Sequence, residues 1–381
     1  MDSPRWELIV RNSSGDVLRH FGLGIAVSLL CLAELKTARA QKSPERPAGK
    51  ALCDDADAGS LVAAIDRELA AFQEMPSAHR LRLAGRDVDK QVYVEQILLP
   101  IRAAAQKGNA TLCRLLSKKL KLRSLAGKAR VTAYYHPVVR GSVTAKPPFL
   151  VPLYRRPSDE VFVHKTTEEI LSGALSERGL ELVYVDSLAT ALHIHIEGSV
   201  TVALEDGREI NLTTDGHNGH AYQNPLRLLV QDKVIPSDFQ AAPGHSRTHA
   251  FVLAHPDILR KYWSKNPHFV FFKETPLRGT GKFGELVAGR SIAIDPRHVP
   301  MGSVLLLRTS VSTVGQDAHT SHKTITRLVL AQDTGAAIVG PKRVDLFLGS
   351  GDDARFAAAH TNQLGDLWLV MPPKPLRRQT H

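Results

Sequence analysis

From about residue 129 onward the chain is divided into short apolar runs separated by turn residues, and this pattern constrains the fold more than any other feature. Nine runs, each bounded by Gly, Pro, Asn or Asp, read LVYVDS, LHIHIEG, VTVALEDGREINL, HFVFF, RSIAI, SVLLL, TITRLVLAQ, RVDLFLG and DLWLVM. Residues 205–207, Glu-Asp-Gly, separate two alternating runs and predict a hairpin turn. One segment, PLRLLVQDKVIPSDF, is expected to form a helix among the strands. Many short strands favour β-barrels over a doubly wound sheet.

The preceding segment, Ser60–Leu125, has apolar residues at three- and four-residue spacing and is expected to be helical. Pro100 should kink or break one of these helices. No G-x-G-x-x-G follows a predicted strand and no P-loop is present, so nucleotide binding is not expected. The sequence alone therefore predicts a mainly β, α+β protein with N-terminal helices.

Two aspartates near the C-terminus stand inside or at the end of apolar runs. Asp333 ends TRLVLAQD, and Asp345 lies between apolar neighbours in RVDLFLG. A carboxylate is costly to bury, and both burial and a nearby like charge raise its pKa. Asp345 is therefore a candidate general acid that holds a proton near neutral pH. The alternative is a solvated strand residue, or an ion pair with Lys342 or Arg343.

Residues 1–40 have the features of a targeting segment. Phe21–Ala33 is an uncharged run of thirteen residues, too short to span a bilayer. Ala-Arg-Ala at 38–40 fits the small-residue rule for signal cleavage, which places the mature start near Gln41. We expect a signal peptide or an N-terminal anchor, with a lipid on Cys31 as the rival.

Export would leave two cysteines, Cys53 and Cys113. An oxidising compartment permits one disulfide between them, and two separate core thiols are the alternative. His193 and His195 alternate as on a strand, but no carboxylate or further histidine at ligand spacing completes a metal site. We therefore expect no metal and no cofactor.

The chain is basic, with a net charge of +11. Beyond residue 40 it keeps 44 Lys and Arg against 34 Asp and Glu, which is +10. A basic exported protein favours an acidic extracytoplasmic polymer or surface as partner. No zinc finger, RNP motif or basic helix indicates nucleic acid. Cell-wall glycan with carboxylate-bearing peptides is the expected partner, and attraction to a membrane surface is the second.

Seven segments between Thr132 and Pro372 carry a family resemblance by their shared order. They read TAYYHPVVRGS, PLYRRPSD, DGHNGHAYQ, NPHFVFFKE, GRSIAIDPRHVPMGSVLLL, AQDTGAAIVGPKRVDLFLGSG and LWLVMP. In these segments the chain resembles the membrane-bound lytic murein transglycosylase A family. The resemblance implies a double-psi β-barrel with a second, smaller β-barrel inserted into it.

The resemblance also implies a division of the chain into parts. We expect the signal peptide or anchor at 1–40 and a helical N-terminal part of the main domain at 41–145. The inserted barrel, which would form one wall of a glycan groove, is expected at 146–250. The double-psi barrel, or 3D domain, with the catalytic aspartates is expected at 251–381. The protein would act as a monomer in the periplasm, in association with the outer membrane.

The implied reaction is cleavage of the β-1,4 bond between N-acetylmuramic acid and N-acetylglucosamine in peptidoglycan, with release of a 1,6-anhydro sugar. The family pattern makes Asp345 the single acid/base and places Asp333 beside it. Ordinary glycosidases need two carboxylates, for a water or a covalent intermediate. Here the sugar's own 6-hydroxyl would attack C1, and such an intramolecular reaction gains from proximity. An ionised Asp333 could raise the pKa of Asp345 and stabilise positive charge at C1.

Further residues in the matching segments are expected to contact the glycan. Each has a plainer alternative as a core aromatic, a turn cap or a solvated charge. The predicted substrate-binding residues are Tyr134, Tyr135, His217, Asn218, Gly219, Tyr222, Asp295, Gln332 and Lys342.

Two positions depart from the family pattern. Ala336 stands where relatives have a second glycine after QDTG, and Val200 ends EGSV where relatives have a QGSG-type turn. Alanine would be strained if that position required positive φ. A non-catalytic peptidoglycan-binding barrel is therefore the alternative function. An ordinary hydrolase, which would leave reducing ends, is a third.

Overall fold

The computed structural model describes residues 52–125, 127–236, 239, 246–314 and 320–372, so the segment expected to target the chain, 1–40, lies outside the described residues. The helices are α2 (Ala58–Glu74), α3 (Lys90–Tyr93), the π-helix η1 (Val94–Leu98), α4 (Leu99–Gln106), α5 (Asn109–Lys118), α6 (Glu160–Val163), α7 (Thr167–Leu171), α8 (Leu188–Glu197), α9 (Pro225–Gln231), α10 (Ser246–Ala254), α11 (Pro256–Ser264) and α12 (Asp352–His360). Within the described ranges no helix is both long and apolar enough to cross a bilayer.

The described residues form seventeen strands. They are β1 (Arg80–Leu83), β2 (Arg86–Asp89), β3 (Lys121–Ser124), β4 (Ala129–His136), β5 (Val138–Gly141), β6 (Val151–Tyr154), β7 (Glu181–Val185), β8 (Ser199–Leu204), β9 (Glu209–His217), β10 (Val270–Thr275), β11 (Thr280–Gly281), β12 (Gly284–Glu285), β13 (Ser291–Ala293), β14 (Val304–Val314), β15 (Thr320–Asp333), β16 (Arg343–Ser350) and β17 (Asn362–Met371).

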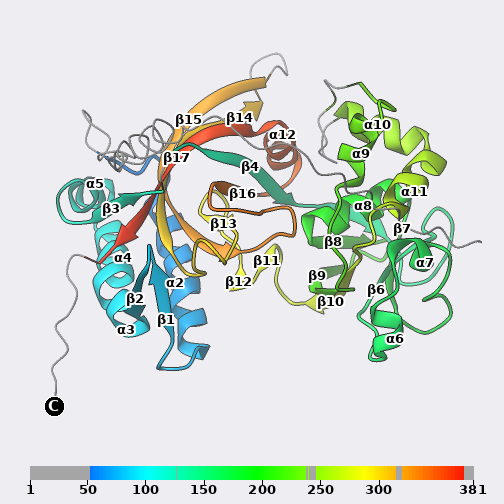
Figure 1. The fold of residues 1–381 in the computed structure, drawn as a ribbon, viewed down its shortest axis with the longest axis horizontal. Coiled ribbons are helices and arrows are strands. Elements are labelled where there is room, and N and C mark those ends of the chain that lie inside the picture. The colour runs from blue at the N-terminus through cyan, green and yellow to red at the C-terminus, as the bar shows by residue number, and fades with distance from the viewer. Residues whose placement is uncertain (1–51, 126, 237–238, 240–245, 315–319, 373–381) are drawn as a thin grey trace, which may run out of the picture. The chain divides into compact units, whose positions relative to one another are not determined.

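Six strands form a closed ring, called here the main barrel (Figure 1). Their order is β14-β15-β13-β16-β4-β17, and antiparallel pairing between β14 and β17 closes the ring. The pairs β13–β15 and β16–β4 are parallel, so the chain must cross over between these strands instead of turning directly. The closed barrel confirms the fold expected for the C-terminal part of the chain.

The core of the main barrel is shared with the N-terminal helices, as expected. Leu305, Leu306 and Leu307 of β14 are fully buried, because the strand is covered on both faces. Helix α2 buries Leu61 and Phe72 in the same cluster. The helix starts at Asp57, whose carboxylate accepts the Ser60 N–H at 2.9 Å and satisfies one of the free amides of the first turn.

A second, smaller ring, called here the inserted barrel, is built from strands between Val138 and Thr275. Its sheet has the order β10-β9-β8-β5, and β6 pairs with β7. Two isolated bridges, Ser142 with Tyr184 and Arg155 with Phe272, join these sheets into a ring. Its own apolar core includes the fully buried Phe271 and Phe272. The domain boundaries drawn at residues 40, 145 and 250 stay predictions.

The strand expected at LHIHIEG is wrong, because these residues end helix α8. Ser187 caps the helix by accepting the Thr190 N–H at 3.1 Å, and Gly198 ends it with a φ of 78°. The histidines alternate as on a strand, but five of the ten side chains of this helix are buried and none is exposed, so no polar face marks its helical period. Helix α9 confirms the helix expected in PLRLLVQDKVIPSDF, although it ends at Gln231, and the other helices from α6 to α12 were not expected among the strands.

The helical segment continues through Pro100 without the break considered for it, and its hydrogen-bond pattern changes from π to α just before this residue. Helices α3, η1 and α4 follow one another without a gap, and Pro100 stands in the first turn of α4. The π-helix immediately before it accommodates a residue that cannot donate a backbone hydrogen bond.

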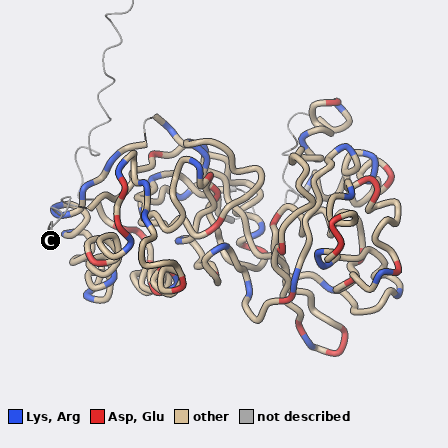
Figure 2. The backbone as a smooth tube through the Cα atoms, turned by 60° about the horizontal axis from the view of Figure 1, so that its bottom comes forward, with Lys and Arg blue, Asp and Glu red and all other residues tan. Residues whose placement is uncertain are grey.

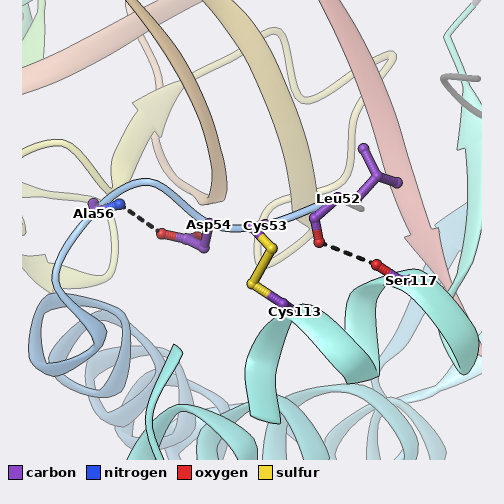
Figure 3. Close-up of a disulfide and its surroundings, with 6 residues drawn as sticks. All are labelled: Leu52, Cys53, Asp54, Ala56, Cys113 and Ser117. Carbon is purple, nitrogen blue, oxygen red and sulfur yellow. Dashed lines mark hydrogen bonds between the residues drawn. A yellow bond between two sulfur atoms is a disulfide. The ribbon is translucent and has the colours of Figure 1, made fainter. Parts of the chain in front are cut away.

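The two cysteines left open by the sequence form a disulfide, Cys53–Cys113, across 60 residues (Figure 3). It ties the chain ahead of α2 to helix α5, where Ser117 also donates to the Leu52 carbonyl at 3.4 Å.

The residue after Cys53 anchors the same segment to the main barrel. The Asp54 carboxylate makes a two-fold contact with the Arg290 guanidinium, at 2.6 and 2.8 Å. Both side chains are almost completely buried, and Arg290 also donates to the Leu328 carbonyl at 2.9 Å. A buried ion pair of this kind persists only because its remaining donors and acceptors are satisfied.

Candidate active site

Asp345 lies in β16 beside β4, to which β16 runs parallel. Its register partner is Thr132, whose hydroxyl donates a hydrogen bond to the Asp345 carboxylate. The neighbours Val344 and Leu346 are buried in the barrel core, whereas Asp345 is only partly buried. Because side chains alternate along a strand, Asp345 projects from the face of the sheet opposite to its neighbours.

Asp333 is the last residue of β15 and is held by two donors. The Tyr134 hydroxyl donates to one carboxylate oxygen at 2.9 Å, and the Thr334 N–H donates to the other at 2.8 Å. The Tyr134 ring packs against Phe347, with ring centroids 5.3 Å apart. Tyr134 thus connects β4 to the strand end that carries Asp333.

A single residue of β13 sets the spacing between the two aspartates. Ala293 is the register partner of Asp333 on one side and of Asp345 on the other. The pairing of β13 with β15 shifts register between Ile292 and Ala293, and the two aspartates therefore flank Ala293 on the first and third of three neighbouring strands. Their Cα atoms are separated by two strand spacings, or about 10 Å.

Glycine 281 allows the chain to pass close over Asp333. A Cβ atom placed on Gly281 would lie 2.9 Å from the Asp333 carboxyl carbon and 2.9 Å from the Gln332 carbonyl oxygen. Because no real Cβ tolerates such contacts, the approach of β11 to the end of β15 requires glycine here.

Burial raises the pKa of both aspartates. Desolvation raises the pKa of Asp345 to about 6 against the opposing effects of Arg343 and the Thr132 hydrogen bond, and the charge of Glu197 adds to the increase. Desolvation likewise raises the pKa of Asp333 to about 6, opposed by its bonds to Thr334 and Tyr134 and supported by the charge of Asp345. Two carboxyl groups whose pKa values lie near 6 can exchange protons with a substrate at neutral pH.

The sequence analysis missed Glu197, the third carboxylate at this site. It is the last residue of α8, its side chain is 8% exposed, and one of its oxygens accepts the Tyr135 N–H at 3.3 Å. The other oxygen lies 3.5 Å from the His193 ring. An acid inside the apolar run LHIHIEG was the available signal, but the residue was treated as the start of a turn.

Tyr135, predicted with Tyr134 to contact glycan, lies on the opposite face of β4. It is 5% exposed, and its hydroxyl is 3.0 Å from the His193 ring nitrogen. The structure therefore brings Tyr134 together with Asp333 and Asp345, and places Tyr135 against α8.

Four predicted substrate-binding residues lie at and after the end of β9, in the inserted barrel. Asn218 is fully buried and its amide donates to the carbonyls of Lys165 and Pro267, at 2.9 and 2.7 Å. His217 is exposed and accepts the Gly219 N–H at 3.0 Å. Gly219 itself has a φ of 86°, which favours glycine. The two hydrogen bonds of the buried Asn218 amide hold in place the loop that carries His217 and Gly219.

Tyr222, further along the same loop, is partly buried. Its ring lies 5.6 Å from the His268 ring. Burial raises its pKa, and the charge of Glu197 contributes, which places the tyrosine in the electrostatic environment of the active site.

The remaining predicted residues lie in the main barrel. Asp295 is 3% exposed and accepts bonds from the Arg297 side chain and from the Gly340 N–H at 2.7 Å, so its pKa is lowered, chiefly by Arg297. Gln332 is 1% exposed and its amide donates to the Glu68 carboxyl group at 2.9 Å. Lys342 is exposed. The substrate contacts assigned to these side chains stay predictions.

The two departures from the family pattern have simple structural settings. Ala336 is exposed and does not have positive φ, so alanine is not strained there. Val200 is fully buried in β8, paired with Leu212, and contributes to the core of the inserted barrel. Neither residue distorts the backbone around Asp333 or Asp345. In the described part of the chain, no group of three or more His, Cys, Asp or Glu side chains is placed to hold a metal ion.

Two family models match the chain side by side. The MltA specific insert domain matches residues 130–273, and the 3D domain matches residues 290–371. The first covers the strands of the inserted barrel, and the second contains both aspartates.

Individual relatives agree with this match. The chain is 28% identical to the membrane-bound lytic murein transglycosylase A of Vibrio cholerae over 249 residues, which are 64% of the chain and 66% of the relative. The chain thus spans about two thirds of the length of this curated relative.

Solved structures agree in fold. E. coli MltA with bound chitohexaose is 22% identical with a TM-score of 0.69, covering 86% of this chain and 93% of that one. The lytic transglycosylase LtgG of Burkholderia pseudomallei is 26% identical with a TM-score of 0.51, covering 86% of this chain and 97% of that one.

Proposed function

The chain belongs to the membrane-bound lytic murein transglycosylase A family, and from this membership we propose that it is a lytic transglycosylase of peptidoglycan. It cleaves the β-1,4 bond between N-acetylmuramic acid and N-acetylglucosamine and releases a 1,6-anhydromuramic acid end. The observation that carries the proposal is the placement of Asp333 and Asp345 on the two strands that flank β13, each paired with Ala293 and each with a pKa near 6.

Asp345 is the acid and then the base of this reaction. Its carboxyl proton passes to the glycosidic oxygen as the bond from C1 to that oxygen breaks. The 6-hydroxyl of the same muramic acid attacks C1, forms the new C1–O6 bond and returns its proton to Asp345. The same carboxyl group gives one proton and regains one, so it ends the reaction in its starting form. No water is consumed, which distinguishes the reaction from hydrolysis.

Asp333 and Tyr134 act while positive charge develops at C1. An ionised Asp333 stabilises the positive charge that develops at C1. The Tyr134 hydroxyl and the Thr334 N–H hold this carboxylate in one orientation and favour its ionised form. Thr132 orients the carboxyl group of Asp345 in the same way.

The glycan strand is held by residues from both barrels in this proposal. Tyr134, the loop of His217, Gly219 and Tyr222, and the exposed Lys342 are the predicted contacts that remain accessible or partly accessible. The bound chitohexaose of the E. coli relative shows that a protein of this fold accepts an oligosaccharide.

The same family membership supports a location in the cell envelope, and we propose the finer placement and the monomeric state that follow. The protein is exported and acts in the cell envelope, in the periplasm and next to the outer membrane, as a monomer. Lys and Arg are interspersed with Asp and Glu along both barrels (Figure 2), but residues 138–275 hold 14 Lys and Arg against 16 Asp and Glu, so the excess of positive charge belongs to the rest of the chain. That distribution fits a polymer substrate whose stem peptides carry carboxylates.

Product analysis tests the proposal. Purified sacculi are incubated with the full chain and with Asp345→Asn, and the soluble muropeptides are analysed by mass spectrometry. Anhydro ends from the wild type alone support a lytic transglycosylase. Products heavier by one water identify a hydrolase, and retention on sacculi without any product identifies a binding protein.

A further inference from the structure

Residues 96–130 form a basic segment that the proposed reaction does not use. They hold nine Lys and Arg and no Asp or Glu. Two of these cations, Arg102 and Lys128, form ion pairs with acids of other segments. Five others are exposed on α5, on β3 and in the turn that joins these two elements (Figure 1), and they are called here the basic surface: Arg114, Lys118, Lys119, Lys121 and Arg123.

The cations of the basic surface come from adjoining positions. Arg114 and Lys118 are four residues apart on α5 and therefore share one face of the helix. Lys121 and Arg123 alternate with partly buried residues along β3, so both project to the solvent side of the strand. In the part of the chain that the structure describes, no cation of the basic surface takes part in an ion pair. Their positive charges therefore add to one another.

Neighbouring acids do not neutralise the basic surface. The Arg123 guanidinium donates to the Ala84 carbonyl at 3.0 Å, which brings the β1–β2 hairpin beside β3. Two arginines of this hairpin stand opposite two aspartates in the strand register, and Arg86 adds one more positive charge. Asp54 and Asp55, which follow the disulfide to α5, are both held in ion pairs with arginines of other segments.

The basic surface lies away from the catalytic aspartates. Strand β17 pairs at one end with β4, where Asn362 is the register partner of Thr132. At its other end it pairs with β3, where Met371 is the register partner of Lys121. These two points are nine residues apart, which is about 30 Å along the strand. The basic surface is therefore outside the place where the glycosidic bond would be cleaved.

The chain that follows the predicted targeting segment arrives at the same surface. The disulfide of Cys53 holds the start of the described chain against Cys113, the residue before Arg114 (Figure 3). Twelve residues, 41–52, separate Cys53 from the predicted segment at 1–40 and can span at most about 40 Å. A membrane that received the predicted segment would therefore be within reach of the basic surface.

Two plainer roles explain only part of this charge. Lys118 lies in the last turn of α5, where a cation offsets the helix dipole. A lysine on β3, the edge strand of its sheet, hinders pairing with another chain. Neither role explains Arg114 in the middle of the helix, or the absence of any acid from residue 96 to residue 130.

We propose that the basic surface binds the phosphate headgroups of anionic phospholipids and holds the protein on a membrane surface. The inference goes beyond the transglycosylase function and does not depend on it. The uncharged run at 21–33 is too short to span a bilayer, so by itself it would be a weak anchor. A weak anchor becomes a stable one when a polybasic surface supplies a second attraction to anionic lipid.

Vesicle sedimentation of the full chain tests the proposal. Vesicles of phosphatidylcholine are compared with vesicles of phosphatidylcholine and phosphatidylglycerol, over a series of salt concentrations. Because the predicted anchor is the same in all variants, the difference between the two kinds of vesicle measures the electrostatic contribution. The surface variant removes three cations, Lys118→Gln, Lys119→Gln and Lys121→Gln. The matched control removes three exposed cations of the inserted barrel, Arg140→Gln, Arg227→Gln and Lys261→Gln.

The wild type should bind the anionic vesicles more tightly than the neutral ones, and salt should weaken this preference. The surface variant should lose affinity for the anionic vesicles by on the order of a hundredfold, at about fivefold per lysine. Its affinity for neutral vesicles and its release of anhydro products from sacculi should not change. The control variant should bind both kinds of vesicle as the wild type does.

Equal losses in the surface variant and the control would overturn the proposal, because net charge and not the basic surface would then set the affinity. A surface variant that binds vesicles normally and sacculi weakly would assign the surface to an anionic wall polymer, which also overturns it. The double variant Lys118→Gln/Lys119→Gln leaves β3 intact and covers the case in which the triple variant aggregates. It should lose affinity for anionic vesicles by about 25-fold, and unchanged binding would leave protection of the edge strand as the role of the charge.

Discussion

Replacing Asp345 by Asn should abolish release of anhydro products and, above pH 6, stabilise the main barrel. An amide can neither give nor take the proton, so the reaction loses its carrier. The same amide oxygen can still accept the Thr132 hydroxyl, and the fold should be kept. The stabilisation follows because the wild-type protein ionises this carboxyl group in surroundings that oppose its charge.

The magnitude follows from the pKa of Asp345, which rises from 3.8 to about 6 on folding. An increase of about 2 in pKa, at about 1.4 kcal/mol per unit, corresponds to about 3 kcal/mol. Because the folded state binds the proton more tightly, the wild type loses this free energy as pH rises from about 4 to about 6. Asn is never ionised and loses nothing. The variant should therefore match the wild type near pH 4 and exceed it by up to about 3 kcal/mol at pH 8.

Unfolding by denaturant, followed by circular dichroism at pH 4, 6 and 8, measures this difference. Asp353→Asn is the control, because Asp353 is exposed on α12 and should show no such dependence on pH. An Asp345→Asn variant with unchanged or lower stability at pH 8 would refute the reasoning, since the carboxylate would then not be held against a desolvation cost. Retained activity would refute its role as the acid and base.

Three further outcomes are expected. Tyr134→Phe removes a hydrogen bond to the ionised Asp333, which is worth about 1.5–3 kcal/mol. The pKa of Asp333 should rise, and the acid limb of the pH–rate profile should move up by about 1–2 pH units. An acid limb that does not move would contradict a role for ionised Asp333. Cys113→Ala opens a link across 60 residues and should lower the free energy of unfolding by about 4 kcal/mol in denaturant titrations, without changing the specific activity of the folded protein. Asp54→Asn leaves the Arg290 charge buried without its counter-ion and should lower the free energy of unfolding by about 3–5 kcal/mol in the same assay. A decrease of less than about 1 kcal/mol would show that the ion pair is not needed for stability.

The parts of the fold that local patterns specify were predictable. Strands β13 to β17 lie where short apolar runs end in turn residues, because burial on a barrel wall and the chemistry of turns act over a few residues. Helix α8 was not predictable in this way. None of its side chains is exposed, and a helix without an exposed polar face has no clear helical period in its sequence.

The candidate site was predictable only in its principal residues. Asp333 and Asp345 were identifiable as acids set in apolar runs and by their match to the family pattern. Tyr134 was also predicted for the site, but its hydrogen bond to Asp333 was not, and neither Thr132 nor Glu197 was identified, because all three belong to segments far from the aspartates in the chain. A sequence shows that a carboxylate is costly to bury, but not which donors or charges surround it.

The sequence by itself determined the class of fold, the family and the two acids, since each depends on short patterns or on ordered segments. Tertiary structure decided the disulfide, the closure of both barrels, the spacing of Asp333 and Asp345 across Ala293, and the place of Glu197 at the edge of β4. All of these are contacts between segments far apart in the chain. Their free energy depends on distance, burial and the local dielectric, which exist only after the chain has folded.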